Sequence, residues 1–176
     1  MSVVKVLERT VAVFKSDPTG FPKGHQTALN KYEIFCANRT AELYTTFLGL
    51  IGEENLSWCD DAEYTASFMA NVPFPGKNNE RAVSGGATQS RKMQGIVRYE
   101  YKGNIIEECC KEGKQHGLRV VCTQMGHIWV RLFKNGRRLA QIVLNADLSE
   151  QSSMDDGGLE ILKQHIHLVK DCFQSK

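Results

Sequence analysis

The sequence lacks several features that would assign a class of protein directly. It contains no apolar run of about 18 residues, so we expect no transmembrane helix. The first residues, MSVVKVLERT, carry charge inside the apolar stretch and show no small-residue cleavage site, unlike a secretory signal. The 22 basic and 20 acidic residues nearly cancel, so no strong field favours nucleic acid. We therefore expect an intracellular protein that is not secreted and does not bind nucleic acid.

The six cysteines lack the spacing of a disulfide framework or of a zinc knuckle. Cys109 and Cys110 are adjacent, so on a strand they would point to opposite faces. Structural zinc ligands usually come in pairs two to four residues apart, which this pair does not match. We expect reduced thiols in a reducing compartment, no bound metal and no other cofactor.

A cysteine nucleophile with a histidine base is the catalytic arrangement that the residues allow. Cys109 or Cys122 would pair with His116 or His127. No third group is specified to orient the base, and buried cysteines usually behave as small apolar side chains. The stretch SGGAT at 84–88 lacks the Gly-Lys-Ser/Thr ending of a nucleotide loop. We therefore assign no catalytic residue and favour a role without catalysis, while an enzyme stays open as the alternative.

Glycines recur at intervals of 22 or 23 positions in the second half of the chain. Short stretches that alternate apolar and polar residues lie between them, which is the periodicity of strands. Glycine tolerates the positive φ that a tight hairpin turn needs. The pattern predicts one antiparallel hairpin in each repeat. The glycines in step are Gly95 with Gly117, Gly103 with Gly126 and Gly113 with Gly136.

The second unit resembles the MORN repeat, the membrane occupation and recognition nexus motif. The matching residues are two aromatics, a turn glycine and a closing stretch one unit earlier: Trp129, Phe133, Gly136, Gly113, His116 and Gly117. The resemblance implies an array of β-hairpins. It also implies a docking role, because such arrays mostly act as scaffolds in membrane-associated, cytoskeletal or multisubunit assemblies.

The likeness covers about 95–145 and departs from the family pattern in both units. Arg131 and Glu108 stand where the family usually has an internal glycine. Ile106 and Cys110 replace the aromatic residues of the first unit. The segment is thus a degenerate two-unit array, and an ordinary antiparallel meander with evenly spaced turns stays open as an alternative.

Helical periodicity appears on both sides of this segment. From 25 to 51 it predicts one bent helix or two, with Asn38 or Thr40 as a cap for the second and Gly52 as the end. From about 158 to 174 the apolar residues form a complete stripe, which must pack on the sheet or on a partner. The stripe consists of Leu159, Leu162, Ile166, Val169 and Phe173.

We therefore predict an α+β protein that forms one compact unit. Residues 1–72 are a mainly helical N-terminal part, in which the segment 3–15 is either helix or strand, and 73–93 are a loop or linker. Residues 94–148 form the MORN-like antiparallel meander sheet. The polar stretch 149–158 leads to a C-terminal amphipathic helix, 157–174, packed on the sheet.

We predict a non-catalytic protein-interaction or scaffold protein, a subunit or adaptor of a larger assembly that docks a protein partner through the sheet. The expected binding residues are Tyr101, His116, Trp129, Arg131, Phe133 and Arg137. Peripheral membrane contact through the basic turn, which consists of Arg131, Lys134, Arg137 and Arg138, stays open. The sequence does not indicate an oligomeric state. The alternative is a small enzyme or ligand-binding domain with a pocket between sheet and helices, using His116, His127 or Cys122.

Overall fold

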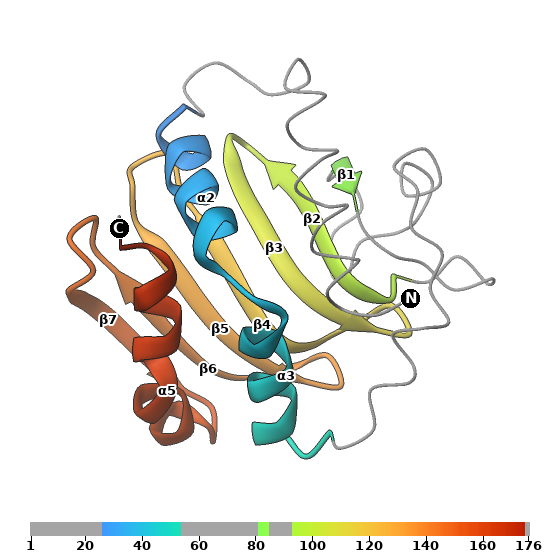
Figure 1. The fold of residues 1–176 in the computed structure, drawn as a ribbon. Coiled ribbons are helices and arrows are strands. Elements are labelled where there is room, and N and C mark those ends of the chain that lie inside the picture. Colours follow the sequence, from blue (N-terminus) through green and yellow to red (C-terminus); the bar gives the residue numbers. More distant parts are fainter. Residues whose placement is uncertain (1–25, 54–80, 85–92, 175–176) are drawn as a thin grey trace.

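The computed structural model describes residues 26–53, 81–84 and 93–174, and within them three helices cover one face of a seven-stranded sheet (Figure 1). The order of the strands in the sheet follows the chain and every neighbouring pair is antiparallel, so the sheet is a meander. The α+β class is confirmed. The helices are α2 (Gln26–Asn38), α3 (Ala41–Leu50) and α5 (Leu159–Cys172). The strands are β1 (Arg81–Ser84), β2 (Gly95–Tyr101), β3 (Asn104–Lys111), β4 (Lys114–Cys122), β5 (Ile128–Lys134), β6 (Arg137–Leu144) and β7 (Glu150–Asp155).

Two-residue turns of one type connect three of the strand pairs. Lys102, Glu112 and Asn135 have φ values of 50–51°, and the glycine that follows each has a φ of 79–85°. Positive φ at both central residues gives the type I′ turn, whose twist matches that of the flanking strands. The predicted hairpin turns at these glycines are therefore confirmed.

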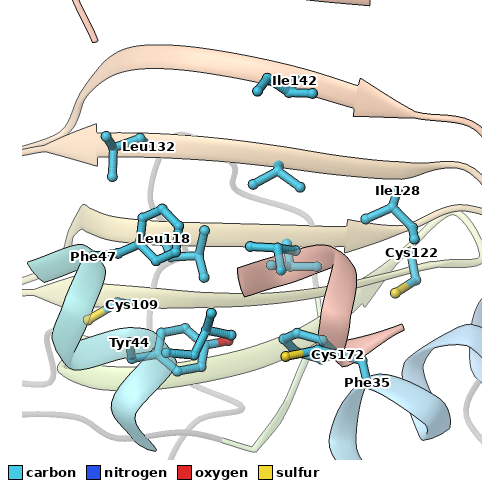
Figure 2. Packing of buried hydrophobic residues seen from close by; sticks show 14 of the residues in the cluster. Phe35, Tyr44, Phe47, Cys109, Leu118, Cys122, Ile128, Leu132, Ile142 and Cys172 are labelled. Carbon is cyan, nitrogen blue, oxygen red and sulfur yellow. The ribbon is translucent and has the colours of Figure 1, made fainter. Parts of the chain in front are cut away.

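The helices and the inner face of the sheet enclose the main hydrophobic core. Phe35 of α2 and Phe47 of α3 pack with alternate residues of the strands, such as Leu118 and Leu132 (Figure 2). A second buried cluster lies on the opposite, outer face. It consists of Met93, Val97, Ile106, Cys110 and Val121. The sheet thus has apolar contacts on both faces.

The helices begin and end close to the predicted positions. Thr40, with extended backbone, separates α2 from α3, so the N-terminal helical pattern forms two helices. Gly52, with a φ of 95°, follows α3. The stripe of α5 buries Leu162 and Val169 in the core, and Phe173 stacks on Phe35 with ring centroids 5.0 Å apart. The C-terminal helix therefore packs on the sheet and on α2.

Two strands lie in segments that the sequence assigned to connections. β1 falls within the predicted loop 73–93 and pairs with β2, and β7 falls within the polar stretch 149–158 and pairs with β6. Backbone hydrogen bonds make these pairings, and the polar side chains of β7 carry no apolar alternation that would reveal them. The expectations for residues 3–15 and 54–80 lie outside the described residues. None of the described helices has the length and apolarity needed to cross a membrane.

Two neighbouring residues of α5 test the packing of this helix. Leu162 is 0% exposed and Ile161 is 37% exposed. We expect Leu162→Ala to lower the free energy of unfolding by about 2–5 kcal/mol, because it leaves a cavity in the core. Ile161→Ala should change it by only about 0.5 kcal/mol. Urea unfolding followed by circular dichroism measures both, and equal small effects would mean that α5 does not hold the core together.

Candidate functional site

The predicted binding residues occupy different parts of the sheet. Tyr101 and Trp129 pack against the hydrophobic cluster of the outer face, and Arg131 lies on the same face as Trp129. Phe133, further along β5, is almost fully buried. Arg137 is exposed at the turn between β5 and β6, and His116 is buried beside the end of α3. The structure brings Trp129 and Arg131 together and separates them from His116.

Trp129 lies in the middle of a patch that spans four strands of the outer face. The register places Val121 of β4 on one side of it and Val143 of β6 on the other. Both valines are buried, whereas Trp129 is partly exposed. We call this surface the outer patch: Val121, Trp129, Arg131, Gln141, Val143 and Met154.

Contacts within β5, from β5 to β6 and from β6 to β7 fix the polar half of the outer patch. The guanidinium of Arg131 lies over the Trp129 ring, 5.2 Å from its centroid, and its Nε donates to Oε1 of Gln141 at 2.6 Å. The Gln141 amide in turn points Nε2 at the sulfur of Met154, 3.7 Å away. Met154 is 47% exposed. The outer patch therefore presents an indole, a guanidinium and a thioether that are already ordered relative to one another.

His116 has a structural environment of its own. Its Nδ1 accepts the backbone N–H of Asn135 at 2.9 Å, so the ring proton is on Nε2, which donates to Oε1 of Glu53 at 2.9 Å. Lys111 binds the same carboxylate oxygen at 2.7 Å. Burial lowers the pKa of His116, and the carboxylate of Glu53 only partly offsets this. The neutral ring thus ties the end of α3 to two turns of the sheet.

A buried carboxylate that the sequence analysis did not single out joins the helices to the sheet. Glu107, on the inner face of β3, is 0% exposed. Arg39 donates to both of its oxygens, from Nε to Oε2 at 2.7 Å and from Nη2 to Oε1 at 2.7 Å. Tyr32 donates its hydroxyl to Oε1 at 2.6 Å, and Tyr44 donates to Oε2. We call these four residues the Glu107 hub.

The ionisation of the Glu107 hub is set by competition between burial and pairing. Burial alone would raise the pKa of Glu107, but the charge of Arg39 and the hydrogen bonds from Arg39, Tyr32 and Tyr44 lower it below the usual value. Burial raises the pKa of both tyrosines, and the nearby carboxylate raises it further. Arg98, opposite Glu107 on β2, lies 5.5 Å from the Tyr32 ring centroid. The hub is a satisfied ion pair whose carboxylate stays ionised.

Of the residues proposed for the alternative pocket, Cys122 lies in the core and His127 lies in the turn before β5. Cys122 is buried in the core, and burial raises the pKa of its thiol (Figure 2). A thiol that stays protonated is a poor nucleophile and a poor metal ligand. Backbone groups of His127 bond to Thr123 in the turn before β5. Within the described ranges, no group of three His, Cys, Asp or Glu side chains is placed to hold a metal ion.

No family model, curated protein or solved structure matches this chain. The choice between sites therefore depends on their own geometry. The Glu107 hub is buried and saturated with hydrogen bonds, whereas the outer patch is ordered and partly exposed. The outer patch is the candidate functional site.

The ion pair of the Glu107 hub should affect both the free energy of unfolding and its dependence on pH. Glu107→Gln leaves the Arg39 guanidinium buried without its counter-charge, so we expect the free energy of unfolding to fall by about 3–5 kcal/mol. In the wild type, the folded chain keeps Glu107 ionised at a pH where the unfolded chain takes up a proton. The contribution of ionised Glu107 to the free energy of unfolding is therefore present above the ordinary glutamate pKa of 4.5. It is lost as the pH falls through the lower pKa of the folded state.

Urea unfolding at several pH values measures both effects. The Gln variant should lack this part of the acid dependence, and Glu33→Gln, at an exposed position of α2, serves as the control. A Gln variant as stable as the control would show that the ion pair does not hold the helices.

Proposed function

We propose that this protein is a non-catalytic interaction or scaffold protein that docks a protein partner through the outer patch. The observation that carries this proposal is the partly exposed stack of Arg131 on Trp129, held on the central strands by Gln141. The packed core and the Glu107 hub lie on the opposite, inner face of the same sheet and hold its strands in place. A binding surface on such a scaffold keeps its shape before the partner arrives.

The composition of the outer patch is that of a protein-binding centre. Tryptophan, arginine and methionine are enriched at interfaces, and Trp and Arg are also enriched among the residues whose truncation weakens binding strongly. Ordering a long side chain on binding costs about 0.5–1.5 kcal/mol. Arg131 is already held against Trp129 and Gln141, so most of this cost is met in the free protein.

The chemistry of the patch indicates what the partner presents. An apolar side chain would cover the indole of Trp129 and the exposed sulfur of Met154. A carboxylate would face the guanidinium of Arg131, and the exposed basic residues Lys134 and Arg137 at the end of β5 and the start of β6 extend the positive charge. A partner with an acidic rim around an apolar centre fits this surface, and its association should weaken with salt.

The resemblance to MORN repeats supports the same role, since such arrays mostly act as scaffolds. Membrane contact through the basic turn gains less support. Arg138, one of its four cations, pairs with Asp156 at 2.8 Å, and Arg131 is engaged in the outer patch. A turn with so few cations and no apolar anchor binds an anionic surface weakly. We therefore place the function in protein docking.

Two exposed methionines provide a matched test of this proposal. Met154 belongs to the outer patch, and Met125, 78% exposed, lies in the turn between β4 and β5. Tagged wild type, Met154→Ala, Trp129→Ala and Met125→Ala would be purified from the native cell, with bound proteins quantified by mass spectrometry. We expect one stoichiometric partner that Met125→Ala keeps and that the other two variants lose.

Binding measured with the purified partner makes the test quantitative. The dissociation constant should rise at least about tenfold for Met154→Ala and Trp129→Ala, because both remove contact area at the centre of the interface. Circular dichroism and urea unfolding check that Met154→Ala, at an exposed strand position, keeps its fold. Equal partner capture by all four proteins would exclude the outer patch as the docking site.

A further inference from the structure

The last strand of the sheet has an open edge. Among the described strands β7 pairs with β6 alone, and all six of its residues are exposed. Figure 1 shows β7 at one end of the sheet, with α5 in front of it. An edge strand presents backbone N–H and C=O groups that are ready to pair with another strand.

The register identifies which amides of β7 point to this edge. Asp156, directly after β7, donates its backbone N–H to Leu139 of β6 at 2.9 Å. Backbone groups alternate in direction along a strand, so the amides of Met154 and Ser152 also face β6. The amides of Asp155 and Ser153 therefore point to the open edge.

Helix α5 lies beside this open edge. Asp155 of β7 and one face of α5 line an open groove of about 450 Å³. The helix contributes Leu159, Glu160, Lys163 and Gln164, which lie together because residues three to four apart share a helix face. A strand added to β7 would lie along this groove, with every second side chain directed at α5.

The charge of the groove selects the kind of segment that fits. Two carboxylates, Asp155 and Glu160, line the groove, and Glu150 lies beside it, 3.9 Å from Lys163, which is the one cation among the lining residues. Basic side chains on an added strand would compensate this excess. A second copy of β7 would not, because it would bring the same acidic side chains, Glu150 and Asp155, to the edge, and like charges that face each other across a strand pair destabilise it.

We propose that β7 and α5 form a second docking site, which takes an extended basic segment of a partner protein as an eighth strand of the sheet. Backbone hydrogen bonds to the amides of Ser153 and Asp155 hold the segment, and lysine or arginine side chains at alternate positions meet Asp155 and Glu160. This site goes beyond the function proposed for the outer patch and does not depend on it.

A synthetic peptide tests the site directly. The probe is a fluorescein-labelled octapeptide of alternating lysine and valine, titrated with the full chain at physiological salt and followed by fluorescence anisotropy. The matched control peptide alternates glutamate and valine. We expect saturable binding of the lysine peptide, weakening as salt is added, and no binding of the glutamate peptide. Absence of saturable binding by the lysine peptide would overturn the proposal.

Two variants locate the bound peptide. Ser153→Pro removes an amide that points to the open edge and leaves the bonds to β6 in place, since proline is tolerated on edge strands. Glu160→Lys reverses the charge of the helix wall at an exposed position. Each should weaken binding at least about tenfold, whereas Ser153→Ala and the remote charge reversal Glu33→Lys should not.

The same variants distinguish peptide binding at the β7 edge from binding elsewhere and from pairing with a second copy of the chain. Binding that both Ser153→Pro and Glu160→Lys leave unchanged would show that the peptide sits elsewhere, and would overturn the proposal. Analytical ultracentrifugation of the unliganded protein addresses a second copy. A dimer that Ser153→Pro dissociates would mean that the edge pairs with itself, and would also overturn the proposal. A monomer that binds the lysine peptide supports it.

Discussion

The buried carboxylate of Glu107 is the contact on which the placement of the helices against the sheet depends. It joins β3 to α2 through Tyr32, to α3 through Tyr44 and to the segment between them through Arg39. Removing an ion from water costs several kcal/mol, and only well-directed partners offset that cost. A shift of either helix along the sheet would leave this charge unpaired, so the hub selects one arrangement where apolar packing alone would tolerate several.

With the helices packed on the inner face, the surfaces of the described sheet that could take the proposed partners are its outer face and its edge strand β7. The outer patch and the β7–α5 groove meet on β7. Its Met154 side chain belongs to the outer patch, while Ser153 directs its amide to the open edge. If one partner supplied both an extended segment and an apolar surface, it could bind the outer patch and the β7–α5 groove together. Binding at one site would then raise the effective concentration of the partner at the other.

Local rules predicted much of this fold. The hairpin turns follow from glycines at positive φ, and α5 follows from its apolar stripe. Trp129 and Arg131 were both predicted as binding residues, and the structure places them on one face of the sheet. β7 was missed because its polar residues show no alternation, and with it Met154 and the open edge. The Glu107 hub was missed because Arg39 and Glu107 are 68 positions apart, and a charged residue inside an apolar strand signals only that a partner is needed.

Amide hydrogen exchange of wild type and Tyr44→Phe tests most directly whether the Glu107 hub holds the helices on the sheet. The substitution removes one hydrogen bond to the carboxylate, worth about 1.5–3 kcal/mol for a charged acceptor, and leaves the ring in the core. If the hub holds the helices, the amides of α2 and α3 in Tyr44→Phe exchange at least about tenfold faster while those of β5 and β6 keep their protection. Unchanged exchange in both helices, or an equal loss of protection throughout the sheet, would contradict it.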